Sequence, residues 1–178
     1  DACNSQPYSK LHSAGISVGG HCIPVYPHMY LQSDKAAKLV RVAREVNKLA
    51  PKRALDLATK ELGGIDGKKV LISGVSYRTG VKEAAFSGAL DLYRLLSYAG
   101  AKVNVIDELF DHQEVSNLGM EPAEMEDYDA LFINSGSRAF QLSILGMLAK
   151  SALVIDGRVT LKAQDWGNLI CVGESIPN

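Results

Sequence analysis

Apolar residues recur at three- and four-residue spacings between positions 36 and 62. This period is typical of an amphipathic helix or of two helices in succession. Pro51 interrupts the pattern and predicts a kink or a division there. Gly63 and Gly64 follow the last apolar position and predict the end of the helical segment. We therefore place a domain boundary at residues 65–67.

Beyond residue 67 the pattern changes to short apolar runs that alternate with helix-period segments. The runs predict strands at 69–74, 102–107, 130–134, 152–156 and 169–172, and the other segments predict helices at 87–98, 108–118 and 139–149. Strands that alternate with helices favour right-handed βαβ units and a parallel sheet covered on both faces. The expected fold class is therefore α/β, with a helical segment followed by a Rossmann-like, doubly wound domain.

Composition narrows the possible partners and the environment. The 178 residues are 47% hydrophobic and 22% charged, which is enough to bury a substantial core. A net charge of −1 gives no broad attraction for nucleic acid, and no apolar run is long enough to span a bilayer. The three cysteines are widely spaced and contain no Cys-x-x-Cys pair, so we expect reduced thiols in the cytoplasm and no metal site.

One cysteine lies in an unusual setting, because Cys22 is surrounded within residues 18–27 by two glycines, a histidine and two prolines. These residues disfavour helix and strand, so we predict a stiff loop that presents the thiol. A thiolate can add to an aldehyde and form a thiohemiacetal, which can be oxidised again. A small buried thiol explains a lone cysteine equally well on composition alone. His21 would point to the opposite side of an extended loop, which favours a positioning or substrate-contact role over a hydrolase base.

Three ordered segments carry a resemblance to a known family. Residues 18–27, together with Ala2, Asn4, Pro7 and Gly15, resemble the active-site loop of the UDP-glucose/GDP-mannose dehydrogenase family, most closely its UDP-N-acetylhexosamine branch. The Gly-Val-Ser-Tyr-Arg run at 74–78 with Ser-Gly-Ala-Leu at 87–90 resembles a second family segment. The Val-Ile-Asp-Gly-Arg run at 154–158 resembles a third.

This resemblance implies an enzyme that oxidises the C6 alcohol of a UDP-sugar to a carboxylate with NAD, and Cys22 as its nucleophile. The residues expected to bind the UDP-sugar are Asn4, Gly15, Ser17, Val18, Gly19, Gly20 and His21 in the first part of the chain, and Tyr77, Arg78 and Arg158 in the second. Arginine suits a diphosphate because its planar fork can donate two hydrogen bonds. The family usually carries lysine at the position of Arg78, so the charge is kept and the geometry differs.

The resemblance also implies a domain plan. Residues 1–64 would end a central helical domain that carries the cysteine loop and forms a homodimer, and residues 65–178 would form a UDP-sugar-binding domain. No Gly-x-Gly-x-x-Gly run occurs in the sequence, so the family's NAD domain is expected to be absent from this chain. The residues that bind the cofactor are then unknown, and the chain by itself is expected to be inactive.

Two departures from the family pattern leave an alternative open. Tyr26 stands where the family usually has an aspartate thought to activate water, and a phenol is a poor base at neutral pH. Ala85 replaces an arginine that reaches the cofactor in the family. The alternatives are a non-catalytic module that binds nucleotide sugars or dimerises, and a thiol hydrolase that pairs Cys22 with a distant histidine.

Overall fold

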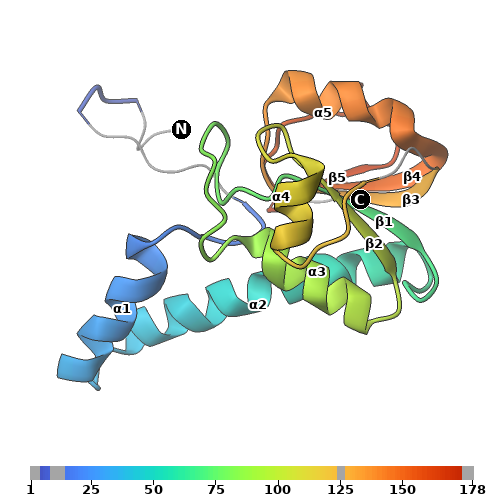
Figure 1. The fold of residues 1–178 in the computed structure, drawn as a ribbon. Coiled ribbons are helices and arrows are strands. Elements are labelled where there is room, and N and C mark those ends of the chain that lie inside the picture. The colour runs from blue at the N-terminus through green and yellow to red at the C-terminus, as the bar shows by residue number, and fades with distance from the viewer. Residues whose placement is uncertain (1–4, 9–14, 124–126, 174–178) are drawn as a thin grey trace.

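The computed structural model describes residues 5–8, 15–123 and 127–173 (Figure 1). Two helices, α1 (Cys22–Ser33) and α2 (Lys38–Glu61), precede a five-stranded sheet. Its strands are β1 (Lys69–Ser73), β2 (Lys102–Ile106), β3 (Tyr128–Ile133), β4 (Leu148–Asp156) and β5 (Leu169–Cys171), and the connections contain α3 (Gly88–Tyr98), α4 (His112–Asn117), α5 (Arg138–Ile144) and the short 3-10 helix η2 (Leu145–Met147). All strand pairs are parallel, in the order β2-β1-β3-β4-β5. The predicted α/β fold class is confirmed.

Side chains alternate between two cores, one on each face of the sheet. Val70 and Ile72 of β1 point into a core that also contains Leu92 of α3, whereas Leu71 points into the opposite core with Ile144 of α5. Figure 1 shows α2 and α3 on one side of the sheet and α5 on the other. Fully burying such a side chain contributes about 1.5–3 kcal/mol. The apolar runs in the sequence therefore form strands that are buried on both faces.

The end of α2 belongs to the same core as the sheet. Ala54, Leu55 and Ala58 are buried in the cluster that contains Val70, whereas Leu39 near the start of the helix is 83% exposed. The helix runs unbroken through Pro51, which is itself buried. The sequence pattern allowed either one helix or two helices in succession. The structure has one continuous helix, Lys38–Glu61.

The predicted loop around Cys22 is wrong, because Cys22 is the first residue of helix α1. Pro24 lies in the first turn, where its missing N–H would have had no partner within the helix in any case. Pro27 removes one backbone hydrogen bond from the interior, and the helix continues past it. The two prolines, three residues apart, therefore lie in the first two turns of a helix and not in an extended loop.

Two further boundaries differ from those expected. Helix α4 begins at His112 and not at 108, because the Asp107 carboxylate holds the Leu109 and Phe110 amides in a turn. Asp111 then caps the helix in a reciprocal pair with Glu114. Strand β4 begins at residue 148, within the predicted helix 139–149, because it pairs with β3 from its first residue onward.

Residues 15–20, which we call the strap, pack against the sheet domain and lead toward α1. Ile16 is buried in the core on the α2 side. Gly157 lies against it so closely that an added Cβ would be 2.6 Å from Cγ1 of Ile16. The strap is therefore packed into the sheet domain before the chain reaches Cys22.

Replacing Ile16 with alanine should lower the free energy of unfolding by about 2–5 kcal/mol, because it removes a buried side chain and leaves a cavity. Urea denaturation measures this. The matched control is Leu39→Ala at an exposed position, where we expect a change within about 0.5 kcal/mol. Equal stability of the two variants would show that the strap is not anchored by Ile16.

Candidate active site

Three strands end at neighbouring positions on the carboxyl edge of the sheet, where parallel α/β sheets bind ligands. Asn134 follows β3 and is fully buried. Its Nδ2 donates hydrogen bonds to the carbonyls of Gly74 (2.9 Å) and Ser76 (3.0 Å) and to Oγ of Ser87 (3.2 Å). Asn134 therefore joins the end of β3 to the turn after β1 and to the start of α3.

The turn after β4 is shaped by a buried carboxylate. Asp156 accepts hydrogen bonds from the amides of Arg158 (2.7 Å), Thr160 (2.6 Å) and Leu161 (2.8 Å). A buried charge is tolerated only where such partners replace its hydration. These bonds fix where the Arg158 side chain leaves the backbone.

Arg158 spans the space between strand ends. Its Nε donates to the carbonyl of Asn134 (2.7 Å) and its Nη2 to the carbonyl of Tyr77 (2.6 Å). Gly15 of the strap lies beside it, because an added Cβ there would be 2.9 Å from the guanidinium carbon. Burial lowers the pKa of the Arg158 guanidinium, and the Asp156 carboxylate opposes that shift. The cation ties the strap side of the site to the turn that carries Tyr77.

The strap is also held at its far end. Asn47 of α2 accepts a hydrogen bond from the Val18 amide (2.8 Å) and donates one to the Val18 carbonyl (3.1 Å). The Gly20 amide donates to the carbonyl of Ala85 (2.8 Å). A Cβ on Gly19 would lie 2.8 Å from Cβ of Tyr77, so only glycine allows this approach.

His21 and Cys22 follow the strap directly. Nε2 of His21 lies 3.3 Å from a carboxylate oxygen of Glu83. The Ala85 amide and, to a lesser degree, His21 lower the pKa of Glu83 below its usual range. Cys22 is an exposed thiol at the first residue of α1. The contact between His21 and Glu83 therefore holds the residue that precedes α1, the helix that presents the thiol.

The structure brings together most of the residues predicted to bind substrate. Gly15, Gly19 and Gly20 contact Arg158 or Tyr77, whereas Ser17 packs against Gly88 at the start of α3. Arg78 is exposed, and its guanidinium carbon lies 5.9 Å from the centre of the Tyr77 ring. Asn4 lies outside the described residues.

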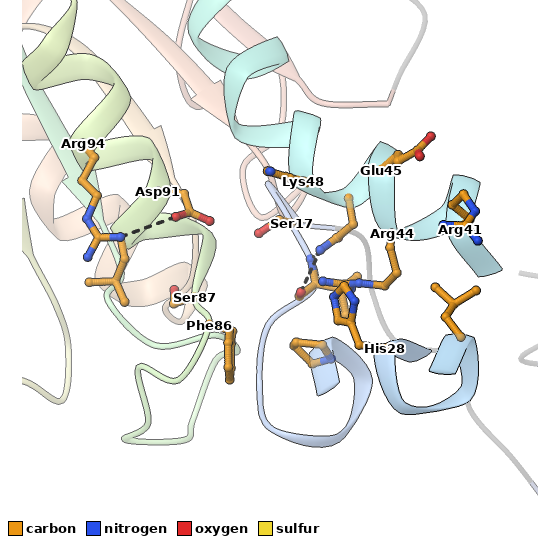
Figure 2. A pocket seen from close by; sticks show the side chains of 15 residues that line it. Ser17, His28, Arg41, Arg44, Glu45, Lys48, Phe86, Ser87, Asp91 and Arg94 are labelled. Carbon is orange, nitrogen blue, oxygen red and sulfur yellow. Dashed lines mark hydrogen bonds and ion pairs between the residues drawn. The ribbon is translucent and has the colours of Figure 1, made fainter. Parts of the chain in front are cut away.

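A cleft of about 480 Å³ opens between α1, α2 and α3 (Figure 2). It shares Ser17 and Val18 with the predicted substrate residues, but Cys22, Tyr77, Arg78 and Arg158 do not line it. His28 of α1 and Arg44 of α2 both line this cleft (Figure 2). The strap therefore borders two separate environments.

The residues that sequence reasoning missed are the ones that organise the site: Asn47, Glu83, Asn134 and Asp156. The last two had a readable signal, because Asn134 directly follows an apolar strand and Asp156 ends one within the 154–158 run. Asn47 and Glu83 carry no such signal, because their partners are 29 and 62 residues away in sequence.

These features define a Rossmann-like α/β domain whose carboxyl edge is covered by a strap that leads to the cysteine at the start of α1. Residues 71–163, just over half of the chain, match the model of the UDP-glucose/GDP-mannose dehydrogenase family, UDP binding domain. The chain belongs to this family.

Individual relatives agree with this assignment. UDP-N-acetyl-D-mannosamine dehydrogenase of Pyrococcus horikoshii is 26% identical over 177 residues, which cover 94% of this chain and 41% of the relative. The Methanocaldococcus jannaschii protein of the same name is 31% identical over 112 residues, covering 61% and 25%. This chain therefore spans about two fifths or less of these relatives.

Solved structures show the same fold. The structure of UDP-D-ManNAc dehydrogenase from Pyrococcus horikoshii has a TM-score of 0.71 at 25% identity and covers 97% of this chain and 41% of that one. A UDP-glucose dehydrogenase from Pyrobaculum islandicum has a TM-score of 0.74 at 22% identity, covering 88% and 38%.

Within the described ranges, no group of three or more histidine, cysteine, aspartate or glutamate side chains is arranged to hold a metal ion. In the same residues, none of the helices combines the length and the apolar character that a membrane crossing requires.

Replacing His21 with alanine should raise the pKa of Glu83 toward its ordinary value, because one of its hydrogen bonds is lost. A lowered carboxyl pKa means that the contact stabilises the fold above the ordinary pKa and is lost as the pH falls through the lowered one. An NMR titration of the Glu83 carboxyl carbon measures the shift, with His28→Ala as the matched control. An unchanged Glu83 pKa in His21→Ala would show that the contact between His21 and Glu83 does not form.

Proposed function

We propose that this chain provides the nucleotide-sugar-binding domain and the catalytic cysteine of an NAD-dependent dehydrogenase. The substrate is a UDP-sugar of the N-acetylhexosamine class, whose C6 alcohol becomes a carboxylate. One observation carries the proposal: the strap that leads into Cys22 is folded against Tyr77 and Arg158 at the carboxyl edge of the UDP-binding domain. The names of the relatives support the dehydrogenase class and the N-acetylated sugar.

Cys22 has the exposure that its proposed role requires. Its thiolate adds to the C6 aldehyde and forms a thiohemiacetal, so that the later oxidation leaves a thioester on the sulfur. Water then hydrolyses the thioester, which releases the carboxylate and returns the thiol. The exposed position of Cys22 at the start of α1 leaves room for a sugar to approach.

The diphosphate and the uridine are assigned to the second part of the chain. Arg78 is exposed beside Tyr77 and offers a fork of donors that suits a diphosphate. Arg158 already donates hydrogen bonds to two carbonyls. Its proposed role is therefore twofold: it links the strand ends, and it adds positive charge to the site. Gly19 and Gly20 are buried against Tyr77, so their proposed role is to hold the strap beside this part of the site.

The described residues do not fit NAD as a resident cofactor. The turn between β1 and α3 runs from Gly74 to Ser87 and lacks the tight glycine-rich turn into a helix that receives a dinucleotide. Ala85 offers no charge where an arginine of the family reaches the cofactor. We therefore assign NAD binding to a domain outside the described residues and assign no step to it here.

Tyr26 favours a second candidate function. Because α1 begins at Cys22, residue 26 lies one turn further along the same helix face, where an aspartate would be well placed to activate water near the thioester. Tyr26 is 61% exposed and is no base at neutral pH. The alternative is therefore a non-catalytic module that binds a nucleotide sugar or contributes to a dimer.

The proposed protein is a cytoplasmic homodimer through its helical part. The helices α1 and α2 expose several large apolar side chains: Val25, Met29, Leu39, Val42, Val46 and Leu49. Exposed apolar surface of this kind is typical of an interface. A second copy of the same region is the partner that the family resemblance implies.

In a preparation that also contains the NAD-binding domain, Cys22→Ser should abolish formation of the UDP-sugar carboxylate. The chain alone should produce no NADH, because it does not hold the cofactor. Measuring NADH and carboxylate together checks both statements, and Cys171→Ser is the matched control. Carboxylate formation at the wild-type rate in Cys22→Ser would exclude Cys22 as the nucleophile, and no activity in the wild type would favour the non-catalytic module.

A UDP-sugar should protect Cys22 of the isolated chain from alkylation by iodoacetamide, because the bound sugar covers the thiol. Mass spectrometry follows the alkylation of Cys22 and Cys171 separately. Arg78→Gln should raise the concentration needed for protection at least about 10-fold, as expected for the loss of a charged hydrogen bond. Arg53→Gln, an exposed change on α2, is the control. Equal alkylation of Cys22 with and without UDP-sugar would contradict the proposed site.

A further inference from the structure

The cleft between α1, α2 and α3 is basic although the chain as a whole has a net charge of −1. Arg41, Arg44 and Lys48 recur at helical spacing along one face of α2, and Arg94 of α3 and His28 of α1 also line the cleft. Three separate helices thus direct nitrogen-bearing side chains toward one space (Figure 2). The basic character of the cleft therefore depends on the tertiary fold and does not come from the solvent-exposed face of a single helix.

Arg44 is the cation in this cleft that most needs a partner. Its Nε is buried and has no hydrogen-bond acceptor. Buried donors in folded proteins are nearly always paired, so such an atom indicates an acceptor that completes the site. Arg41 differs, because its Nη2 donates to the carbonyl of Lys35 (2.9 Å). Lys48 makes no hydrogen bond or ion pair through its side chain to any described residue.

Two carboxylates also line the cleft, and they do not neutralise it. Asp91 lies 3.9 Å from Arg94 in an exposed pair, which is a weak interaction. Glu45 has no partner within ion-pair distance among the described residues. Four cationic side chains therefore face two acidic ones, and Arg44 and Lys48 keep their charge available for an anion.

Phe86 adds an aromatic surface to the same cleft. Its backbone has a φ of +50°, which is unfavourable for a residue with a bulky side chain. Its carbonyl packs against Gly19 of the strap, so the backbone is held in place while the ring stays 59% exposed. Strained residues that expose an apolar ring beside a cleft are concentrated at ligand sites.

We propose that this cleft binds a nucleoside diphosphate, at a site separate from the one assigned to the UDP-sugar. The phosphates pair with Arg44 and Lys48, and a phosphate oxygen accepts the hydrogen bond that Nε of Arg44 otherwise lacks. The base lies against Phe86, since aromatic rings stack on nucleobases. A volume of about 480 Å³ is in the range of small-molecule sites.

Isothermal titration of the chain with inorganic pyrophosphate and with ADP tests the proposal. ADP is the probe because UDP would also enter the site at Arg78. We expect both probes to bind saturably, and Arg44→Gln to weaken both at least about 10-fold. Phe86→Ala should weaken ADP and leave pyrophosphate unchanged. Arg53→Gln is the matched control, and circular dichroism shows that each variant is folded.

Several outcomes would overturn the proposal. Neither probe binding saturably would exclude the site, and weakening by Arg78→Gln but not by Arg44→Gln would place the anion at the predicted substrate site. Equal affinity of ADP in Phe86→Ala and the wild type would exclude a base on this ring. Arg44→Lys keeps the charge and removes the fork, so a loss there as large as in Arg44→Gln supports paired donation by the arginine.

Discussion

The packing of the strap against the carboxyl edge of the sheet is the constraint on which the arrangement of the site depends. Ile16 is buried in the core, and Gly19 approaches Tyr77 more closely than any side chain would allow. Because Cys22 follows the strap at once, the sheet and not the local sequence determines where the thiol lies. A cysteine carried on α1 alone would have no fixed relation to Tyr77 or Arg158.

The polar groups beneath the strap have hydrogen-bond partners, which is why this edge of the sheet can be buried. The amide of Asn134, the carboxylate of Asp156 and the guanidinium of Arg158 are each bonded to at least two backbone groups. Buried polar groups that are satisfied in this way hold a single arrangement, since leaving one unpaired costs about 1–3 kcal/mol. The site is thus made rigid by backbone carbonyls and amides, while the side chains of Arg78 and Cys22 remain exposed.

The sheet could be predicted from the sequence because strands buried on both faces are continuous apolar runs, and the runs at β1, β3 and β4 are unambiguous. Helix α1 could not, because the rule that prolines break helices holds in the interior but not in the first turn, where Pro24 lies. Gly19 and Gly20 were predicted to bind the UDP-sugar, and that role stays a prediction. The neighbour they approach is the Tyr77 turn, a contact between segments far apart in sequence that no local pattern carries.

The strap also explains why two different environments lie so close together. Ser17 and Val18 line the basic cleft, while Gly19 and Gly20 contact Tyr77 on the way to Cys22. Phe86 belongs to both, because its ring faces the cleft and its carbonyl packs against Gly19. An anion bound by Arg44 would therefore lie beside the residues that position the thiol. Val18, which lines the cleft, precedes Cys22 by four residues, so the strap is the shortest backbone path between the cleft and the thiol.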